Sequence, residues 1–262
     1  LDIRASSELK STIEEFKPDI IHSHTFKAGL LARSRNSGVP NVHTFHGHHL
    51  YDPEFGWISR SVLNWLERRL ARRSERLLTI GEKVGNELLA QRIGRADQYL
   101  SIPPGIEPLE DVNAESASKK VGIGKTDFVV VWLGRFTQVK RPDLVVEIAK
   151  KLPSITFVMA GDGELQDRMR PAAPVNLRIV GVQSAAEMWG IADLALLTSD
   201  SEGMPLSMIE AQMSGVPVVA TNVGSVSEIV VDGVTGLLTE VDAGQLASAI
   251  SELNSNQFKL KE

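Results

Sequence analysis

The sequence of 262 residues contains no cysteine. This absence excludes disulfides, thiolate catalysis and cysteine-ligated zinc, and it favours a reducing compartment. The sequence also lacks an apolar run long enough to span a bilayer. It begins Leu-Asp-Ile-Arg, with neither an initiator methionine nor a signal-peptide pattern. We therefore expect a cytoplasmic protein, and a chain taken from the middle of a longer one.

Charge is unevenly distributed along the chain, whose formal net charge is −5. Residues 1–103 carry 15 Lys and Arg against 12 Asp and Glu, a net charge of +3, whereas residues 104–262 carry 13 against 21, a net charge of −8. An acidic chain without a stripe of basic and aromatic residues is a poor binder of nucleic acid. The mildly basic part suits an anionic substrate or a lipid surface.

Short apolar runs rich in β-formers alternate with helical patterns. This alternation predicts an α/β fold with parallel sheets covered by helices on both faces. The Pro-rich segment 103–108 interrupts it, and the polar segment 109–126 is predicted to be a linker. We predict two Rossmann-like domains facing each other across a cleft, over residues 1–103 and 104–262. The predicted strands are 19–24, 41–45, 76–80, 99–102, 128–133, 155–160, 177–180, 194–198, 216–220 and 236–239, and the predicted helices are 27–35, 58–73, 82–91, 141–151, 164–170, 184–191, 205–214, 224–231 and 242–253.

The most specific motif contains two glutamates, Glu202 and Glu210, eight positions apart. Pro205 favours a helix start between them, because proline lacks the N–H that is unpaired in a first turn. Glu202 is then expected in the loop before the helix, and Glu210 near its second turn. A phosphate at this helix start would meet unpaired N–H groups and have a carboxylate on either side. This arrangement suits a nucleotide sugar.

A second motif supplies positive charge. Gly134 and Arg135 follow the predicted strand 128–133, and Lys140 comes five positions after Arg135. We interpret this pattern as a diphosphate seat, because Arg binds phosphate oxygens bidentately and Lys adds a point charge. The alternative is a pair of solvated cations that caps a loop.

Two further segments connect a predicted strand to a predicted helix. Residues 160–164 contain Gly161 but lack the third glycine of a dinucleotide-binding motif, so we interpret them as a tight turn whose backbone comes near the ligand. In the second segment, Ser225 and Glu228 have the spacing of a capping box at the start of a helix. That assignment leaves the role of Gly224 open.

All six histidines lie between residues 22 and 49. The spacing of His22 from His24, and of His46 from His48, puts each pair on one face of an extended segment. No pattern of Asp or Glu completes a metal site, so we predict a polar rim of an active site and no bound metal. The other two histidines are His43 and His49.

The predicted helix 58–73 carries five arginines around a stripe of Leu63, Leu66 and Leu70. A basic amphipathic helix of this kind can lie on an anionic lipid surface. More commonly such a helix packs one face on the protein and exposes the other to solvent. Peripheral contact with the inner face of a membrane is therefore one of two open interpretations.

Taken together, the motifs resemble retaining glycosyltransferases of the GT-B fold, in the large family 4 (GT4) group. The resemblance runs over nearly the whole chain. Its most specific part is the Glu202–Glu210 run with the Gly-Val-Pro-Val-Val-Ala-Thr segment at 215–221. The other matching segments are Gly134-Arg135 with Lys140, the turn at 160–164, residues 102–107, and Thr44-Phe45-His46-Gly47.

The resemblance implies a role for each matching residue. Arg135 and Lys140 would neutralise the donor diphosphate, Glu210 would hold the ribose, and Glu202 would contact hydroxyls of the transferred sugar. His46 would lie on the opposite domain, near the reaction centre. The implied catalytic residues are His46, Arg135, Lys140 and Glu202, and the implied donor-binding residues are Gly134, Gly161, Gly203, Met204, Leu206 and Glu210.

The implied reaction moves a hexose or N-acetylhexosamine, with retention, from a nucleotide diphosphate sugar to a hydroxyl of a glycan or lipid-linked acceptor. UDP is favoured as the commonest donor nucleotide of the group, and neither a cofactor nor a metal is implied. Two alternatives stay open: a nucleotide-sugar-binding module without catalysis, and a sugar-nucleotide epimerase of the same fold.

The sequence also departs from the family pattern. The first βα unit with its Gly-rich loop and the last helix that returns to the N-terminal domain are both missing, so we expect a chain truncated at both ends with an incomplete acceptor half. Pro104 stands where Asn is common before Gly105. Arg141 stands where Gly often follows the lysine.

Overall fold

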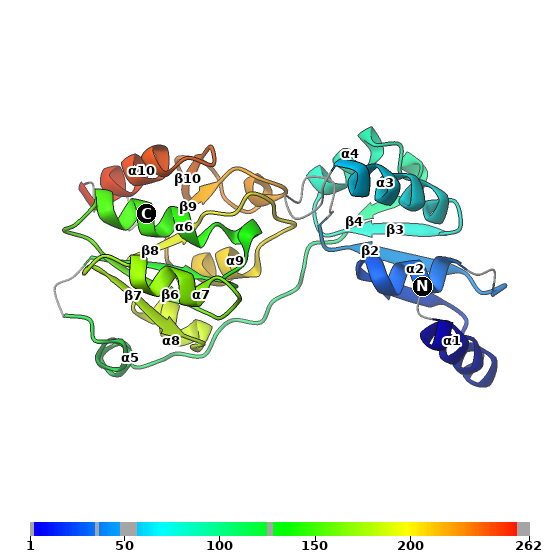
Figure 1. The fold of residues 1–262 in the computed structure, drawn as a ribbon, viewed down its shortest axis with the longest axis horizontal. Helices are drawn as coiled ribbons and strands as arrows, with labels where there is room; N and C mark the ends of the chain where they lie inside the picture. Colours follow the sequence, from blue (N-terminus) through cyan, green and yellow to red (C-terminus); the bar gives the residue numbers. More distant parts are fainter. Residues whose placement is uncertain (1–2, 35–36, 48–56, 125–127, 256–262) are drawn as a thin grey trace. The chain divides into compact units, whose positions relative to one another are not determined.

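The computed structural model describes residues 3–34, 37–47, 57–124 and 128–255. The chain divides into two compact units, Leu1–Pro104 and Gly105–Glu262 (Figure 1). Each unit contains its own parallel sheet with helices between successive strands, which confirms the predicted α/β class with two Rossmann-like domains. Within the described ranges, no helix is long and apolar enough to cross a membrane.

The N-terminal unit is built on a four-stranded sheet of order β1-β2-β3-β4, in which all neighbours run parallel. Its core joins Phe45 and Leu77 of the sheet to Val84 and Leu88 of a covering helix. The elements in chain order are α1 (Ile3–Phe16), β1 (Ile21–His24), α2 (Thr25–Ser34), β2 (Asn41–Phe45), α3 (Trp57–Ala71), β3 (Arg76–Thr79), α4 (Glu82–Ala90), η1 (Ala96–Gln98) and β4 (Tyr99–Ser101).

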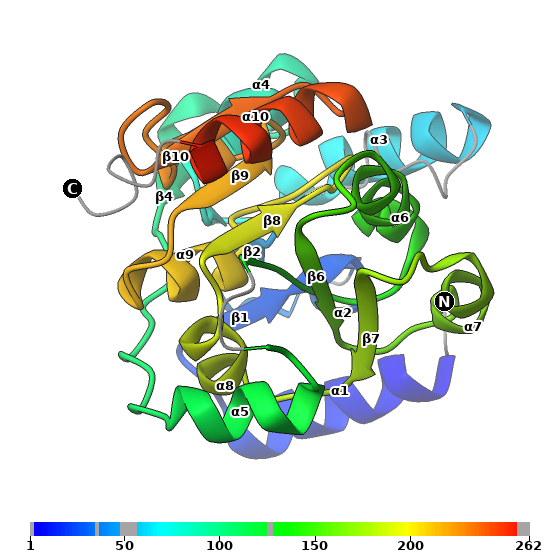
Figure 2. The same cartoon turned by 90° about the vertical axis from the view of Figure 1, so that its left-hand side faces the viewer.

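The C-terminal unit contains a six-stranded parallel sheet of order β10-β9-β8-β5-β6-β7, covered by helices on both faces (Figure 2). Alternate residues of β5 serve the two faces, since Val130 and Trp132 pack with α6 and α10, whereas Val129 and Val131 pack with α5, α8 and α9. The elements are α5 (Ala114–Val121), β5 (Val129–Leu133), η2 (Gln138–Lys140), α6 (Pro142–Lys151), β6 (Thr156–Ala160), α7 (Gln166–Met169), η3 (Arg170–Ala172), β7 (Leu177–Gly181), α8 (Ala185–Gly190), β8 (Leu194–Leu197), α9 (Leu206–Met213), β9 (Val218–Thr221), η4 (Val226–Glu228), β10 (Gly236–Thr239) and α10 (Ala243–Ser255).

The strand order of this sheet reverses between β5 and β8, because β6 and β7 extend to one side and β9 and β10 to the other. At this switch the ladder is short: Val130 pairs with Leu194 and Val131 with Ala195, and both strands continue beyond these pairs. By comparison, β5 and β6 pair through five residues. In open parallel sheets, ligands bind outside the carboxyl ends of the strands at such a switch.

The ten predicted strands are all present, with ends shifted by at most two residues. The prediction of a linker over 109–126 is wrong for its middle, where α5 forms. The Asn113 side chain accepts a hydrogen bond from the N–H of Ser116 at 3.0 Å, and Ala117 and Val121 are buried against the sheet. The predicted elements also omit α1, which precedes the first predicted strand.

The backbone of Gly161, directly after β6, packs closely against the loop that follows β5. Its φ is +133°, and a Cβ built there would lie 1.9 Å from the carbonyl oxygen of Gly134. We expect Gly161→Ala to lower the free energy of unfolding by about 2–5 kcal/mol, measured by chemical denaturation, because backbone strain and steric overlap add. Gly181→Ala is the matched control, since Gly181 also has a positive φ of +73° but nothing lies within 4 Å of its Cβ position. Equal losses in the two variants would contradict the assigned backbone contact.

Candidate functional site

The loops that follow β5 and β8 meet at the switch in strand order. Residues 134–141 follow β5 and lead into α6, and residues 198–205 follow β8 and lead into α9. These two loops contain the predicted diphosphate seat and the first of the two predicted glutamates. The fold therefore brings together motifs that are about 60 residues apart in the sequence.

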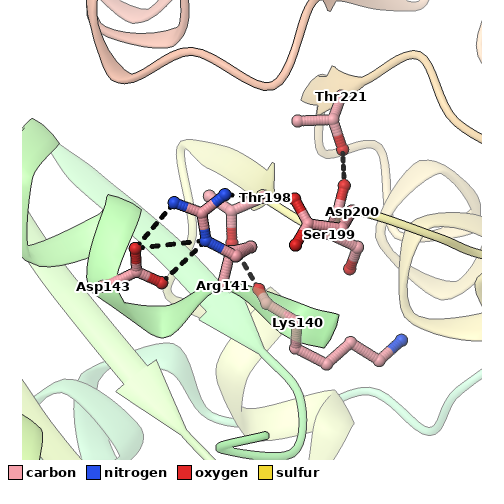
Figure 3. A network of polar contacts seen from close by, with 7 residues as sticks. All are labelled: Lys140, Arg141, Asp143, Thr198, Ser199, Asp200 and Thr221. Atoms are coloured by element: carbon pink, nitrogen blue, oxygen red, sulfur yellow. Dashed lines mark hydrogen bonds and ion pairs between the residues drawn. The ribbon is translucent and has the colours of Figure 1, made fainter. Parts of the chain in front are cut away.

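Direct hydrogen bonds hold the two loops together. The N–H of Asp200 donates to the carbonyl of Val139 at 2.8 Å, and Thr198 Oγ1 donates to the carbonyl of Lys140 at 2.8 Å (Figure 3). Thr198 Oγ1 also accepts a hydrogen bond from Trp132 Nε1 of β5 at 3.0 Å. The backbone of Lys140 is thus bonded to Thr198, which begins the loop after β8.

Lys140 and Glu202 form an ion pair at the centre of the site, with 2.6 Å between Nζ and Oε1. The side chains are 21% and 7% exposed, so solvent screens the pair only weakly. Ser199 Oγ donates a second hydrogen bond to the same Oε1 at 2.5 Å. Thr221 Oγ1 in turn donates a hydrogen bond to the carbonyl of Ser199 at 2.8 Å. A carboxylate and an ammonium group therefore stand side by side in a defined arrangement.

The backbone of Gly224 packs against the backbone of Glu202. It has a φ of +52°, and a Cβ there would lie 1.8 Å from the carbonyl oxygen of Glu202. The next N–H, of Ser225, donates to the carbonyl of Gly203 at 2.9 Å. This tertiary bond forms in place of the predicted capping box. The Ser225 side chain makes no cap bond, and its buried Oγ has no partner among the described residues. Only the short η4 forms where a helix over 224–231 was predicted. The prediction of helix and capping box is therefore wrong.

Arg141 follows Lys140 with φ 49° and ψ 54°, in the left-handed region. Its guanidinium forms a bidentate ion pair with Asp143, with Nη2 2.8 Å from Oδ2, and reaches Asp200 Oδ1 through Nη1 at 3.1 Å (Figure 3). The hydrogen bonds of Asp143, and then of Asp200, raise the pKa of Arg141 further above its ordinary value. Nε, Nη1 and Nη2 of this arginine therefore each donate to a carboxylate, on two different segments of the chain.

The turn after β6 shapes the loop that carries Arg135. The N–H of Gly134 donates to the carbonyl of Ala160 at 3.0 Å, and the N–H of Phe136 donates to that of Asp162 at 2.7 Å. Arg135, between these two bonds, has an exposed side chain with no hydrogen bond or ion pair to the residues that the structure describes. Gly161 is explained by backbone packing, whereas the Arg135 guanidinium is available to a ligand.

The start of α9 follows directly from the Glu202 loop. Pro205 occupies the N-cap position, and Glu210 lies in the second turn of α9, as predicted. In the described part of the chain, no hydrogen bond uses the backbone N–H groups of Gly203, Met204 and Leu206. The side chain of Met204 is buried, so only its backbone is available to a ligand. The Glu210 side chain forms neither a hydrogen bond nor an ion pair with Lys140 or Glu202.

Three of the predicted histidines cluster at the carboxyl ends of β1 and β2, in the N-terminal unit. His24 Nδ1 lies 2.9 Å from His46 Nε2, and the rings of His22 and His24 are in contact, with centroids 4.3 Å apart and planes tilted by 37°. Desolvation, followed by the charge of His24, lowers the pKa of both His22 and His46. Across the described ranges, no group of three or more His, Cys, Asp or Glu is arranged to hold a metal ion; His48 and His49 lie outside those ranges.

His43 is the buried member of this group, with 1% of its surface exposed. Its Nδ1 lies 2.9 Å from Ser23 Oγ, and burial, followed by the charge of Arg33, lowers its pKa to about 3. Arg33 is itself buried and pairs with Glu67 at 3.0 Å. His43 is therefore part of the core of the unit and not of a polar rim.

Sequence reasoning missed the residues that support the central pair. Thr198, Ser199 and Asp200 directly follow the buried strand β8. Thr198 and Asp200 bond to the loop after β5, and Ser199 donates to Glu202 within its own loop. A polar run after an apolar strand is a usable signal, because it lies at the carboxyl edge of a parallel sheet.

Two family models match the chain. The model described as Glycosyl transferases group 1 matches residues 113–262, and the model described as Glycosyl transferase 4-like domain matches residues 1–105.

Curated relatives are glycosyltransferases. UDP-Gal:alpha-D-GlcNAc-diphosphoundecaprenol alpha-1,3-galactosyltransferase of Escherichia coli is 28% identical, over 92% of this chain and 67% of that protein. Putative glycosyltransferase EpsD of Bacillus subtilis is 26% identical, over 94% and 70%. D-inositol 3-phosphate glycosyltransferase of Mycobacterium tuberculosis is 29% identical, over 90% and 54%, so the chain spans about half of that relative.

Solved structures share the fold. Alr3699/HepE of Anabaena, in complex with UDP and glucose, superposes with a TM-score of 0.85 at 21% identity, over 98% of this chain and 73% of that one. Sucrose-phosphate synthase of Thermosynechococcus elongatus superposes with a TM-score of 0.85 at 18% identity, over 98% and 69%.

The low pKa of His43 predicts an acid sensitivity of the N-terminal unit. Between about pH 6.5 and pH 3, the unfolded chain binds a proton at His43 that the folded chain does not, so stability falls as the pH is lowered through this window. The slope from this residue is at most about 1.4 kcal/mol per pH unit. Urea denaturation at several pH values should show it, and His43→Gln should flatten the profile. An NMR titration in which His43 protonates near pH 6.5 would refute the assignment without any variant.

Proposed function

Because the chain belongs to the Glycosyl transferases group 1 family and has the GT-B fold, we propose that it transfers a hexose or N-acetylhexosamine from a nucleotide diphosphate sugar to a hydroxyl of a glycan or lipid-linked acceptor. The observation that carries this proposal is the ion pair of Lys140 with Glu202 at the switch between β5 and β8. A cation suited to a diphosphate is adjacent to a carboxylate suited to sugar hydroxyls.

In this proposal Lys140 and Arg135 bind the donor diphosphate. An ammonium group has three donors, so Lys140 can bind a phosphate oxygen while it keeps its hydrogen bond to Glu202. The exposed Arg135 adds a planar fork that suits phosphate oxygens. Both cations would stabilise the negative charge that develops on the leaving diphosphate as the sugar–phosphate bond breaks.

The start of α9 binds the remaining parts of the donor. Backbone N–H groups of Gly203, Met204 and Leu206 would donate to sugar and phosphate oxygens, helped by the positive end of the helix dipole. Glu210, one turn further along α9, would accept from the ribose hydroxyls, and Glu202 from hydroxyls of the transferred sugar. Gly134 and Gly161 would contribute through the backbone that they hold in place.

We further propose that the transfer retains the anomeric configuration. The leaving phosphate would deprotonate the acceptor hydroxyl, which would attack from the same face of the sugar. Glu202 would stabilise positive charge on the sugar, and His46, which is hydrogen-bonded to His24, would act from the N-terminal unit near the reaction centre. No metal and no cofactor takes part in this proposal.

UDP is the proposed donor nucleotide. The name of the E. coli relative includes UDP-Gal, and the Anabaena structure contains UDP and glucose, which supports this choice. The name of the E. coli relative also includes a diphosphoundecaprenol acceptor, which supports a lipid-linked acceptor and hence a place at the inner face of a membrane.

Peripheral membrane contact would use α3. Val62 and Trp65 are 56% and 60% exposed and lie three positions apart, so they share one face of the helix. Arg69 is exposed further along the same face, and Arg72 is exposed in the turn directly after α3. An aromatic and an aliphatic side chain flanked by arginines suit the headgroup region of an anionic lipid surface.

The diphosphate assignment predicts the effect of removing Lys140. We expect Lys140→Ala to lower kcat/KM for transfer about 100- to 1000-fold, which corresponds to about 3–4 kcal/mol of lost stabilisation. The variant should also weaken UDP binding, measured by calorimetry. Lys150→Ala, at an exposed position of α6, is the matched control and should behave as the wild type.

The donor can be identified by measuring the melting temperature of the protein with UDP, GDP and ADP sugars. A ligand that binds the folded state raises the melting temperature, so the donor should give the largest increase. Unchanged transfer by Lys140→Ala would refute the diphosphate assignment. Saturable UDP binding without any product would favour a binding module, and conversion of a UDP sugar without acceptor would favour an epimerase.

The α3 surface predicts binding to anionic vesicles. The chain should sediment with vesicles that contain phosphatidylglycerol and not with pure phosphatidylcholine vesicles, because both the arginines and the apolar side chains contribute. Trp65→Ser combined with Val62→Ser should reduce the sedimented fraction several-fold. Val175→Ser, at a residue that is 97% exposed on the C-terminal unit, is the control. Equal and negligible sedimentation with both kinds of vesicle would rule out this surface.

A further inference from the structure

Arg141 occupies a backbone conformation that its side chain does not favour. Its φ of 49° and ψ of 54° lie in the left-handed region, where glycine is the least strained residue. The described part of the C-terminal unit has no other non-glycine residue with a positive φ. A strained conformation of this kind persists only when surrounding contacts determine it.

Those contacts come from two different elements. Nε and Nη2 of Arg141 bind Asp143 in the first turn of α6, at 2.8–3.1 Å. Nη1 binds Asp200 Oδ1, on the loop after β8, at 3.1 Å (Figure 3). The fork therefore bridges the start of α6 and the loop that leads to Glu202.

This bridge connects the two sides of the central ion pair. Arg141 is the neighbour of Lys140 in the chain, and Asp200 lies two residues before Glu202. The other links between the loops are the ion pair of Lys140 with Glu202 and the neutral hydrogen bonds that the Lys140 and Val139 carbonyls accept. The contact between Arg141 and Asp200 adds a second charged side-chain link.

We propose that Arg141 is a positioning residue, which holds the Asp200 loop against the start of α6 so that Lys140 and Glu202 meet a nucleotide diphosphate in the correct geometry. This inference rests on the proposed function. In this proposal the diphosphate is bound by Lys140 and by Arg135, whose side chain has no such partners among the described residues, whereas the charge of Arg141 is already offset by two carboxylates.

Two single-charge variants separate positioning from simple electrostatics. Asp200→Asn and Asp143→Asn each remove one negative charge next to the guanidinium, but only Asp200→Asn weakens the link between the two loops, from a charged contact to a neutral hydrogen bond. If Arg141 positions the loops, Asp200→Asn weakens UDP binding about fivefold to tenfold in calorimetry, and Asp143→Asn stays within about twofold of the wild type. A tenfold change corresponds to about 1.4 kcal/mol. If both variants bind UDP as tightly as the wild type or more tightly, the positioning role is wrong.

Variants of Arg141 complete the test. Arg141→Gly removes the link and the backbone strain together, so UDP binding should weaken about tenfold while the melting temperature stays equal or rises. Arg141→Lys keeps the charge but cannot span both carboxylates, so it should not restore wild-type affinity. A lysine variant with wild-type affinity would show that charge alone matters and would overturn the proposal.

Hydrogen exchange gives a readout that needs no nucleotide. Backbone amides of residues 198–203 should exchange faster in Arg141→Gly and Asp200→Asn than in Asp143→Asn and the wild type. Unchanged exchange in all variants would refute the bridge. If the wild type bound no nucleotide diphosphate at all, the proposed function would fall, and faster exchange would still establish the bridge as a structural contact without the catalytic purpose assigned to it.

Discussion

The candidate site depends on one interaction, the ion pair between Lys140 and Glu202. Two weakly screened charges are costly to remove from water, and their attraction offsets this cost only when the geometry is good and the remaining polar atoms have partners. Here the Ser199 hydroxyl gives Oε1 of Glu202 a second donor, and the Thr198 hydroxyl fixes the backbone of Lys140. The pair joins residues 62 positions apart, so it exists only when the switch between β5 and β8 is formed.

Glycines let the supporting loops approach one another through the main chain. Gly161 brings the turn after β6 against the Gly134 carbonyl, and Gly224 brings the segment after β9 against the Glu202 carbonyl. A methyl group at either position would overlap a backbone oxygen. Backbone contacts therefore hold these loops in position, and the side chains of Arg135 and Lys140 remain available to a ligand.

Much of this architecture could be predicted from the sequence, because strands buried on both faces leave apolar runs that are easy to recognise. The place of Glu202 before α9 was predictable from Pro205 alone. The contact of Glu202 with Lys140 was not, since no local pattern encodes a pairing across 62 residues. Ser225 was misassigned for the same reason: its spacing indicates a cap, but the distant carbonyl of Gly203 determines the backbone there.

The short ladder between β5 and β8 has a consequence for how the candidate site is joined to the core. Beyond Val131 and Ala195 the two strands are joined by side chains, such as the Trp132 indole and the Thr198 hydroxyl, and no longer by the sheet itself. Both of these side chains are buried, so a substitution at either one would disturb the core of the C-terminal unit and the position of the Lys140 backbone together. The geometry of the candidate site is therefore coupled to the stability of the fold at this seam.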